Sequence, residues 1–573
     1  MNKIIHLFIF MFLIVFTAIP MTAGAATINE QFNVSDGVSY KDIRYSEDSI
    51  MQAVRVMEID ISNPDTYVDI GVPTALNRLQ TTTAFANFYS QENRAVVGAI
   101  NGSFFHLGTS MNLVSKDNRL VHAGEVYDGE EDKFVNKPIA FGIGENGKGI
   151  IDNYQLEMKY IHNNKSYSIT STNKARSPNN TILYTSYFPG ETTKTNQWGT
   201  EVVVTLPSPP SLKFGTTVTG KVESIRQSGD ETETVIPKNG FVISAHGTGS
   251  EQMSDIKVGD SISLSIDIDS KWQDSSFMLA SGPMLVKDGS VSVTMNQDSA
   301  NAKYRAPRTA VAIDRTGEKV FFVTVDGRQS GYSNGMTIKQ FADYLVNLGA
   351  YRALNLDGGG STTMVTRFPG TDRLSVANSP SDGYERSVST ILMALSTAPL
   401  EIFRDVASSH WAYPSTTKLF RTGTINGYPG GYFEPNGLIS RTETAIMLTR
   451  ELNLDTSQVT DPGFKDVKPT DKYYKEIAAA ANAGLFKGRE EDMFVKAGEL
   501  TRGEMAVLIQ RAYHIENTSN SYFPDVKTSH FAYEAINALA YQGIAEGMPD
   551  GTFRPENSIT RAEFSELLFK VNY

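Results

Sequence analysis

Residues 309–325 read TAVAIDRTGEKVFFVTV and decide the fold of the longer part of the chain. Two runs rich in β-branched and aromatic residues, 309–314 and 319–325, flank the turn Arg315-Thr316-Gly317. A turn containing glycine between two such runs is typical of a β-hairpin. The sequence therefore predicts two antiparallel strands, with Asp326-Gly327-Arg328 at the end of the second.

A helix and a third strand are predicted directly after the hairpin. Thr337 and Gln340 have the spacing of a capping box, in which each side chain satisfies the other residue's backbone N–H. Gly349 is the residue type that commonly ends a helix. The apolar positions that share one helical face are Ile338, Phe341, Leu345 and Leu348. Residues 353–356 then predict a short strand.

That strand leads into three consecutive glycines, in the segment Asp357-Gly358-Gly359-Gly360-Ser361-Thr362. Consecutive glycines cost conformational entropy and return no packing, so they indicate a close approach to a ligand or to another backbone. Successive N–H groups and two hydroxyls are suited to an anion such as phosphate. A plain surface loop is the alternative. The segment is not a Walker loop, because it lacks the Gly-Lys-Ser/Thr ending.

Residues 27–398 as a whole predict a β-rich α+β domain. Short β-type segments alternate with Gly, Asn, Asp and Ser turns, and few stretches have helical periodicity. We divide the region into a β-rich N-terminal part, 27–90, and a main domain, 91–398. Further polar, sharply turned clusters occur at predicted strand ends, at residues 101–105, 244–247 and 305–309.

Three copies of one pattern follow residue 400. Each copy starts with Phe-x-Asp-Val and has an arginine 38 residues after its phenylalanine; the pairs are Phe403 and Arg441, Phe464 and Arg502, Phe523 and Arg561. A hydroxyl residue before each arginine and a glutamate two residues after it form a capping box, so a helix begins there. A positive charge in the first turn is mildly unfavourable, and its threefold recurrence therefore indicates a bound anion.

Bulk composition narrows the classes of function. A chain of 573 residues with 40% hydrophobic and 20% charged residues predicts several folded domains rather than long disorder. The net charge of −12 disfavours nucleic-acid binding. The absence of cysteine removes disulfides, thiolate metal sites and cysteine nucleophiles. No His-rich spacing indicates a transition metal.

The first 26 residues have the pattern of a secretory signal peptide. A positive start, Met1-Asn2-Lys3, precedes an apolar run at 4–19 and small residues at 23–26. The run is shorter than the roughly 20 apolar residues that span a membrane, which disfavours the alternative of an N-terminal anchor. We expect cleavage, export and no transmembrane helix in the mature chain.

The three copies resemble surface-layer-homology (SLH) modules, at 401–460, 461–520 and 521–573. The resemblance implies an all-α pseudo-threefold bundle that binds secondary cell-wall polysaccharide, often pyruvylated, in grooves between modules. It also implies a location at the cell wall or S-layer of a bacterium, which we expect to be Gram-positive. The residues that it assigns to polymer binding are Asp405, Trp411, Arg441, Asp466, Arg502, Asp525 and Arg561.

The order of motifs from about 90 to 398 resembles the phosphodiester glycosidase family. The motifs begin at Asn101 (NGSFF), Gly199 (GTE), Ser244 (SAHG), Pro307 (PRTA), Val325 (VDGR), Leu354 (LNLDGGGSTT), Asn378 (NSP) and Glu385 (ER). The mammalian member of this family removes N-acetylglucosamine from a mannose phosphate diester. The resemblance implies a phosphorylated glycan as substrate and hydrolysis between the anomeric carbon and phosphate.

This chemistry requires charge neutralisation at the phosphate and a carboxylate that acts as base or nucleophile at an oxocarbenium-like sugar. The catalytic candidates are Asp357, Asp326, Glu201 and His246. The substrate-binding candidates are Asn101, Ser103, Arg308, Thr309, Arg328, Gly358, Gly359, Gly360, Ser361, Thr362 and Arg386. Arg308 and Arg328 are the expected phosphate clamps. Surface ion pairs for the arginines and turn-fixing for one aspartate are the structural alternatives.

Two rival functions remain at this point. The first is a noncatalytic, S-layer-associated protein that only binds phosphorylated glycans. The second is a different enzyme on the same scaffold, either a phosphodiesterase that splits the P–O bond or a transferase that decorates exopolysaccharide. The expected hydrolysis requires no cofactor. The residues do not decide whether a divalent cation binds near the carboxylates.

Overall fold

The computed structural model describes residues 26–47, 49–124 and 138–573. The predicted signal peptide therefore lies outside the described residues, apart from Ala26. The chain divides into two compact units, Met1–Thr366 with Ser375–Ala398 and Arg367–Leu374 with Pro399–Tyr573. Within the described part of the chain, none of the helices has both the length and the hydropathy of a membrane span.

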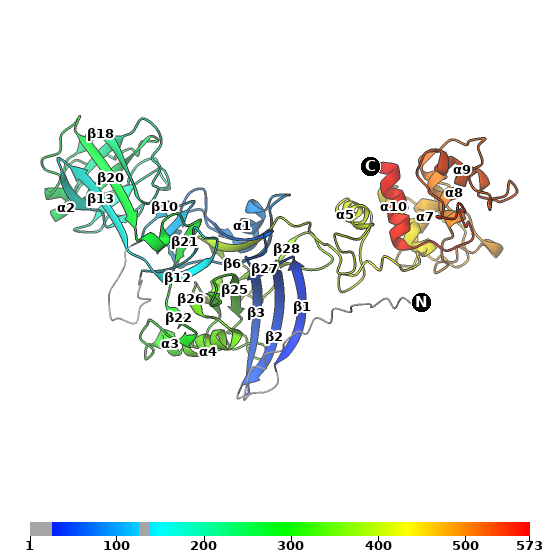
Figure 1. The fold of residues 1–573 in the computed structure, drawn as a ribbon, viewed down its shortest axis with the longest axis horizontal. Coiled ribbons are helices and arrows are strands. Elements are labelled where there is room, and N and C mark those ends of the chain that lie inside the picture. The colour runs from blue at the N-terminus through cyan, green and yellow to red at the C-terminus, as the bar shows by residue number, and fades with distance from the viewer. Residues whose placement is uncertain (1–25, 48, 125–137) are drawn as a thin grey trace, which may run out of the picture. The chain divides into compact units, whose positions relative to one another are not determined.

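An eight-stranded antiparallel sheet forms the centre of the first unit (Figure 1). Its strands lie in the order β1 (Thr27–Ser35), β2 (Val38–Glu47), β3 (Ile50–Asp60), β25 (Lys319–Val325), β24 (Arg308–Ile313), β26 (Arg352–Asn355), β22 (Met284–Lys287) and β23 (Ser290–Val291). The predicted hairpin is confirmed as β24 and β25, with Thr309 opposite Thr324. Because β3 pairs with β25, residues from the predicted N-terminal part complete the same sheet.

Helix α4 (Ile338–Leu348) covers one face of this sheet. The predicted capping box is confirmed, since the Thr337 side chain accepts from the Gln340 N–H and the Gln340 side chain accepts from the Thr337 N–H. Gly349 ends the helix in the left-handed conformation, with φ of 101°. Phe341 and Leu345 are fully buried among strand residues. The helix therefore fixes the connection between β25 and β26, and so the two strand ends that it joins.

Two five-stranded sheets complete the body of the unit. One has the order β28 (Leu374–Val376), β27 (Met364–Arg367), β6 (Ala95–Asn101), β30 (Ile391–Ser396) and β4 (Thr66–Gly71). The other has the order β10 (Arg119–His122), β9 (Val114–Lys116), β21 (Phe277–Ala280), β11 (Ile139–Ile143) and β12 (Gly149–Asn153). Short elements are β5 (Gln80–Thr81), β7 (Phe105–His106), β8 (Thr109–Ser110), β29 (Ser387–Val388), α1 (Thr82–Tyr89) and α3 (Ala300–Lys303).

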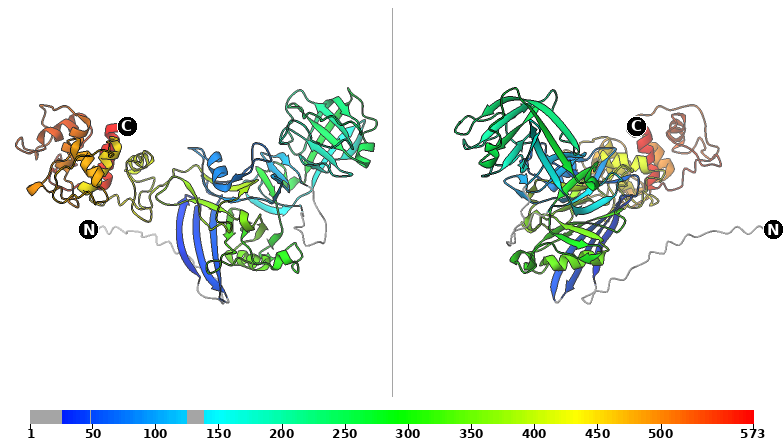
Figure 2. Two further views of the ribbon diagram at one scale, coloured as in Figure 1. Left: turned by 180° about the vertical axis from the view of Figure 1, so that it is seen from behind. Right: turned by 60° about the vertical axis from the view of Figure 1, so that its left-hand side comes forward.

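A further eight-stranded sheet forms a lobe inserted between β12 and β21, drawn in teal and green in Figure 2. Its strands lie in the order β14 (Lys165–Ser168), β13 (Leu156–His162), β20 (Ser261–Ile268), β18 (Thr216–Arg226), β17 (Thr200–Thr205), β19 (Gly240–Ala245), β16 (Thr181–Tyr184) and β15 (Ser171–Thr172). Helix α2 (Thr248–Glu251) follows β19. Buried Tyr160, Phe241 and Trp272 belong to one core that continues into the neighbouring five-stranded sheet.

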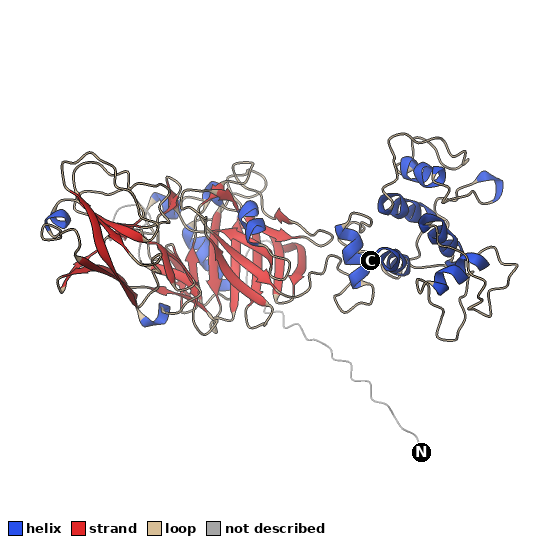
Figure 3. Ribbon diagram, turned by 90° about the horizontal axis from the view of Figure 1, so that it is seen from above, coloured by secondary structure: helices blue, strands red, loops and turns tan. Residues whose placement is uncertain are grey.

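The second unit contains two helices in each of the three sequence copies, and Figure 3 shows helices predominating there. They are α5 (Tyr413–Arg421), α6 (Arg441–Glu451), α7 (Tyr474–Asn482), α8 (Arg502–Tyr513), α9 (Tyr533–Tyr541) and α10 (Arg561–Asn572). The three predicted capping boxes are confirmed at the starts of α6, α8 and α10. The three motif arginines are thus the first residues of these helices.

The predicted fold class, α+β with an all-α C-terminal bundle, is wrong. Strands outweigh helices in the chain as a whole, and the second unit is not an all-α bundle. Its helices are 9 to 12 residues long and are separated by long turn-rich loops. Bridges of β type join Leu438 to Thr560 and Ser440 to Glu499. The reason is that capping boxes specify where helices start, whereas the Gly- and Pro-rich segments between them fold as turns and bridges.

Candidate functional site

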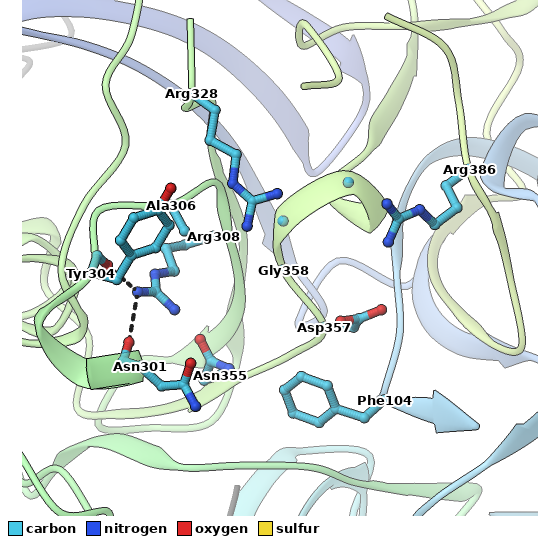
Figure 4. A pocket seen from close by; sticks show the side chains of 12 residues that line it. Phe104, Asn301, Tyr304, Ala306, Arg308, Arg328, Asn355, Asp357, Gly358 and Arg386 are labelled. Atoms are coloured by element: carbon cyan, nitrogen blue, oxygen red, sulfur yellow. Dashed lines mark hydrogen bonds between the residues drawn. The ribbon is translucent and has the colours of Figure 1, made fainter. Parts of the chain in front are cut away.

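A cavity of about 270 Å³ opens where β26 ends and the glycine segment begins (Figure 4). The residues that line it are Phe104, Asn301, Tyr304, Ala306, Arg308, Arg328, Asn355, Asp357, Gly358, Gly359, Gly360 and Arg386. Seven of them are predicted catalytic or substrate-binding residues: Asp357, the three glycines and the three arginines. The ends of β24, β25 and β26, which are neighbours in one sheet, bring most of these residues together.

Asp357 is the one carboxylate among the lining residues. Its backbone is fixed on both sides, since its N–H donates to the Gly102 carbonyl over 3.0 Å and its own carbonyl accepts from Asn101 Nδ2 over 2.6 Å. Burial raises the pKa of Asp357 to about 6, although the Ser361 hydroxyl and the Arg386 guanidinium favour the charged form. A carboxyl group with this pKa exchanges protons readily near neutral pH.

Arg308 is a buried cation beside this carboxyl group. Its Nε donates to the Met336 carbonyl over 3.0 Å, and its Nη2 donates to the carbonyls of Tyr304 and Asn301 over 2.7 and 3.2 Å. Burial, together with the nearby charge of Arg328, lowers the pKa of Arg308 to about 10, so the group stays protonated at neutral pH. Within the described residues it forms no ion pair, which leaves its charge available to an anion.

Arg328 is exposed and follows the end of β25 with a left-handed φ of 60°. Its guanidinium carbon lies 6.0 Å from the centre of the Tyr304 ring, and its nitrogens lie against Gly359. In Figure 4 this side chain extends toward the glycine segment. No hydrogen bond or ion pair joins it to another described residue. It is therefore the second cation at the cavity without a compensating carboxylate.

Arg386 explains why the segment is made of glycine. Its Nη2 lies 2.5 Å from Asp382 Oδ2, and a Cβ at Gly360 would lie only 2.1 Å from that nitrogen. A Cβ at Gly358 would lie 2.8 Å from the Pro307 carbonyl oxygen. Any larger residue would thus push either the guanidinium or the start of β24 away. The glycines let a cation and a neighbouring strand approach the backbone beside Asp357.

Five predicted substrate-binding residues do not line the cavity, and four of them are buried behind the segment: Asn101, Ser103, Thr309 and Thr362. Asn101 Oδ1 accepts from Thr309 Oγ1 over 2.9 Å and from the Thr363 N–H over 3.0 Å. The Ser103 hydroxyl donates to the Ala280 carbonyl over 2.7 Å. Ser361 is also buried, next to Asp357. These side chains support the segment from within the fold.

Asp326 is enclosed away from the cavity. It accepts from Tyr332 Oη and Asn378 Nδ2, both over 2.9 Å, and from the Ser379 N–H at 3.0 and 3.1 Å. Arg55 Nη1 lies 3.4 Å from its Oδ2. Burial raises the pKa of Asp326, while Arg55 acts in the opposite direction. With every oxygen occupied, this carboxylate holds the loop that precedes Arg386.

Glu201 and His246 belong to the inserted lobe and do not line the cavity. Glu201 on β17 is fully buried and accepts from the hydroxyls of Ser244 and Thr195 over 2.6 and 2.8 Å. His246 follows β19, and its backbone N–H donates to the Asn180 carbonyl over 3.1 Å. The structure therefore does not bring these two residues together with Asp357.

Five lining residues were not predicted to bind substrate: Phe104, Asn301, Tyr304, Ala306 and Asn355. Phe104 lies within the NGSFF motif that starts at Asn101. Ala306 lies within the cluster at 305–309, Tyr304 directly precedes that cluster, and Asn355 lies within the motif that starts at Leu354. Position in or next to a motif was therefore the available signal. Asn301 lies on the short helix α3 and had none. Within the described residues, no three His, Cys, Asp or Glu side chains group as metal ligands.

In the second unit the motif arginines link the three copies in a ring. Arg441 Nε donates to the Phe494 carbonyl, Arg502 Nε to the Phe553 carbonyl and Arg561 Nε to the Phe433 carbonyl, over 2.7, 2.8 and 2.8 Å. Each arginine thus contacts the next copy, and the third contacts the first. Their glutamate neighbours are Glu504, Glu563 and Glu443, at 3.4, 3.7 and 2.6 Å.

The motif aspartates hold the loops that these arginines contact. Asp405 accepts from the N–H groups of Phe433 and Glu434, and Asp466 and Asp525 do the same in their own copies. A groove of about 340 Å³ adjoins Arg561 and includes residues of all three copies, among them Glu443, Arg450, Lys472 and Tyr473. Trp411 is 55% exposed and lies outside this groove.

Comparison with known families agrees with this division. The phosphodiester glycosidase model matches residues 214–395, and the S-layer homology domain model matches 402–445, 463–506 and 522–565. An S-layer protein of Bacillus licheniformis is 34% identical over 172 residues, which are 29% of this chain and 19% of that protein. S-layer protein EA1 of Bacillus anthracis is 33% identical over 172 residues, with the same shares. The chain thus spans about a fifth of the length of these relatives.

A cellulosome-anchoring protein of Acetivibrio thermocellus is 32% identical over 157 residues, which are 25% of this chain and 34% of that protein. Among solved structures, an exported protein from Burkholderia pseudomallei K96243 has a TM-score of 0.51 at 17% identity, covering 66% of this chain and 98% of its own. A hypothetical protein from Synechocystis has a TM-score of 0.50 at 17% identity, covering 64% and 63%. These two structures share the fold alone.

The domain combination is that of a cell-surface protein. Residues 214–395 belong to the phosphodiester glycosidase family, and the three C-terminal copies are S-layer homology domains.

Proposed function

We propose that this chain is a secreted, wall-anchored phosphodiester glycosidase. It hydrolyses the bond between the anomeric carbon of a sugar and phosphate, in glycosyl phosphodiesters of the N-acetylglucosamine-1-phosphate type within envelope or exopolysaccharide glycans. The observation that carries the proposal is the convergence of Asp357 with Arg308, Arg328 and Arg386 in one cavity.

The charges of the cavity suit a phosphodiester. Asp382 offsets Arg386, and ionised Asp357 offsets one further cation, so about one positive charge remains among the three arginines. A phosphodiester carries one negative charge. Guanidinium groups bind phosphate oxygens in pairs, and a partly enclosed site strengthens the attraction relative to water. The substrate anion therefore completes the charge balance of the cavity.

A single carboxylate suffices for this reaction. The leaving group is a phosphate monoester, which departs with the electron pair of the C–O bond and needs no proton from a general acid. Water supplies the new C–O bond, and its proton passes to Asp357, whose raised pKa suits a proton acceptor near neutral pH. In the alternative route, Asp357 bonds to the anomeric carbon first and water then releases the sugar. The arginines hold the phosphate through either route.

The remaining lining groups suit a sugar ring. Phe104 and Tyr304 provide aromatic surface, and Asn301 and Asn355 provide side-chain amides. Asn355 Nδ2 already donates to the carbonyls of Gly282 and Leu356, so its Oδ1 is the atom that can accept from a sugar hydroxyl. A cavity of about 270 Å³ is at the small end of ligand pockets. It suits one sugar and its phosphate, with the rest of the glycan outside.

The S-layer homology domains anchor the enzyme, in this proposal, to secondary cell-wall polysaccharide. The groove beside Arg561 combines Arg450, Lys472 and the Tyr473 ring, which suit a polymer that carries carboxylates such as pyruvate ketals. All three motif arginines take part in the ring of contacts between copies, and Arg561 is the one among them that also lines this groove.

The test is hydrolysis of UDP-N-acetylglucosamine and other sugar-1-phosphate diesters by the full mature chain in oxygen-18 water. Label in the released sugar, lost in Asp357→Asn, is the expected result. Label in the phosphate would instead identify a phosphodiesterase. Tight binding of these diesters with no turnover by the unaltered chain would favour the noncatalytic phosphoglycan-binding alternative. Asp343→Asn, a change to a half-exposed carboxylate on α4 outside the cavity, is the matched control and should leave turnover unchanged.

A further inference from the structure

A long loop of the inserted lobe has no part in the site described above. Residues 185–199 connect β16 to β17 and contain neither helix nor strand. Ordered loops of this length without secondary structure are uncommon in compact domains and are usually functional. The loop is therefore a candidate for a second role of the chain.

Two buried arginines hold the end of this loop. Arg176 Nη2 donates to the Asn196 carbonyl, to Asn196 Oδ1 and to the Trp198 carbonyl, each over 3.0 Å. Arg226 Nη2 donates to Thr195 Oγ1 and to the Asn196 carbonyl, each over 2.9 Å. Five hydrogen bonds from guanidinium groups thus converge on residues 195–198.

Glu201 neutralises this pair of arginines from inside the lobe. It is fully buried, and its oxygens lie 3.8 Å from Arg176 Nη1 and 3.4 Å from Arg226 Nη2. Buried ionic networks cost desolvation energy, and their best-attested benefit is a fixed geometry. Here the geometry that the network fixes is that of residues 195–198. Glu201 accordingly acts as a positioning residue for the loop.

The group that the loop presents is an indole. Trp198 is 58% exposed, whereas Trp272 in the same lobe is fully buried. Beside it, Asn196 is exposed, and its Oδ1 accepts from the Trp198 N–H over 3.1 Å as well as from Arg176. Because the amide oxygen is occupied, the amide nitrogen is the group left to donate. An exposed aromatic ring and an oriented amide donor, two residues apart in the sequence, are therefore presented by one loop segment that the arginines hold.

We infer that residues 194–199 form a glycan-binding platform separate from the Asp357 cavity. The Trp198 indole stacks on the apolar face of a pyranose ring, and the Asn196 amide donates to one of its hydroxyls. A protein partner would require a wider apolar patch, but the residues that precede Trp198 in the loop include polar Lys194, Asn196 and Gln197. The platform holds the same polymer that the cavity cleaves, and in naming that polymer the inference rests on the proposed function.

The chain contains three tryptophans, so glycan binding at Trp198 can be measured by tryptophan fluorescence. In the Trp411→Phe variant of the full mature chain, Trp198 is the one exposed indole and Trp272 is a buried reference. Emission is followed during titration with N-acetylchitotetraose, cellotetraose, mannotetraose and purified wall polysaccharide. We expect a saturable blue shift and a several-fold loss of quenching by acrylamide with at least one of them. No change with any of the four would overturn the inference.

Matched variants separate the platform from the catalytic proposal. Asn196→Ala should weaken the titration several-fold, whereas Tyr187→Ala, on the same loop and 36% exposed, should not. Trp198→Ala should raise KM for polymer and leave kcat/KM for UDP-N-acetylglucosamine unchanged. In Asp357→Asn the emission shift should persist while turnover is lost. A shift without turnover in the unaltered chain would contradict the proposed hydrolysis alone, and turnover without a shift would contradict the platform alone.

Discussion

Asn101 Nδ2 donates to the backbone carbonyl of Asp357 over 2.6 Å, although the two residues are 256 positions apart in the chain. The same side chain accepts from Thr309 Oγ1 and the Thr363 N–H, so one buried amide joins the strand end of β6 to both sides of the glycine segment. The position of the Asp357 carboxyl group therefore depends on an amide that does not line the cavity.

Replacement of Asn101 by alanine should lower activity more than it lowers substrate binding. It leaves buried partners unsatisfied, at a cost of about 1–3 kcal/mol in the free energy of unfolding. Because the displaced group is the carboxyl that acts at the anomeric carbon, we expect kcat to fall about 100-fold with little change in KM. Thermal unfolding and kcat/KM of the variant check both parts. A fall in stability with unchanged kcat would contradict the positioning role.

The raised pKa of Asp357 predicts both the pH profile of activity and an effect on stability. The carboxyl must be ionised to act as base or nucleophile, so kcat/KM should rise with pH through about 6 and then level. The unfolded group titrates near 3.9. Because its pKa is raised in the folded state, the protonated Asp357 carboxyl contributes to the free energy of unfolding below about pH 4. This contribution is lost as the pH rises through about 6.

Asp357→Asn should accordingly raise the melting temperature at pH 7 while abolishing turnover. A shift of about two pKa units corresponds to about 3 kcal/mol, which is an upper limit because solvent screens a partly buried group. The stabilisation should disappear when melting is measured below pH 4. Lower stability of the variant at pH 7 would contradict the desolvated environment assigned to this carboxyl.

Alanine replacements of Arg308 and Arg328 should differ in their effect on the melting temperature, although both should lower kcat/KM. Arg328 is exposed and its side chain forms no hydrogen bond or ion pair with another described residue, so Arg328→Ala should lower kcat/KM about 100-fold and leave the melting temperature unchanged. Arg308→Ala should lower both, since three carbonyl groups lose their buried donor. Arg373→Ala, whose side chain is 91% exposed, is the control for loss of a surface charge. Equal kcat/KM in Arg328→Ala and Arg373→Ala would remove Arg328 from the phosphate clamp.

Local signals in the sequence were sufficient for some elements and not for others. The hairpin of β24 and β25 and the helix α4 follow from a turn and a capping box, each contained within a few residues. The pairing of β3 with β25 and the lobe between β12 and β21 depend on contacts between distant segments, which no local pattern specifies. The same holds for the all-α prediction, because the capping boxes specified helix starts but not the bridges between copies.

The candidate site also combines features that local sequence patterns predict with features that depend on contacts between distant segments. Arg308 begins β24, and Arg328 and Asp357 follow the ends of β25 and β26, which are strands of the same sheet. The sequence predicted that each of the three lies at the end of a strand. The sequence did not show that Asp326 is enclosed by Arg55 and Asn378, since those residues come from other segments of the chain. A carboxylate after a strand has the same local pattern whether it faces a cavity or closes a network, and only the packing of distant residues distinguishes the two.

The last prediction concerns how the second unit binds the cell wall. Arg441, Arg502 and Arg561 are buried and join the three copies, so changing all three to alanine should release the protein from purified walls and also lower the melting temperature of the second unit. That result alone does not separate binding from folding.

Substitutions in the groove beside Arg561 separate the effect on wall binding from the effect on folding. Arg450 and Lys472 line it from different copies, and Arg450→Ala with Lys472→Ala removes two cations without breaking the ring of arginine contacts. If the groove holds an anionic wall polymer, this double variant should lose retention on walls several-fold, most strongly at low salt, with unchanged melting and unchanged hydrolysis. Arg404→Ala with Lys465→Ala, outside the groove, is the matched control for net charge. Full retention by the groove variant would place the polymer elsewhere on the second unit.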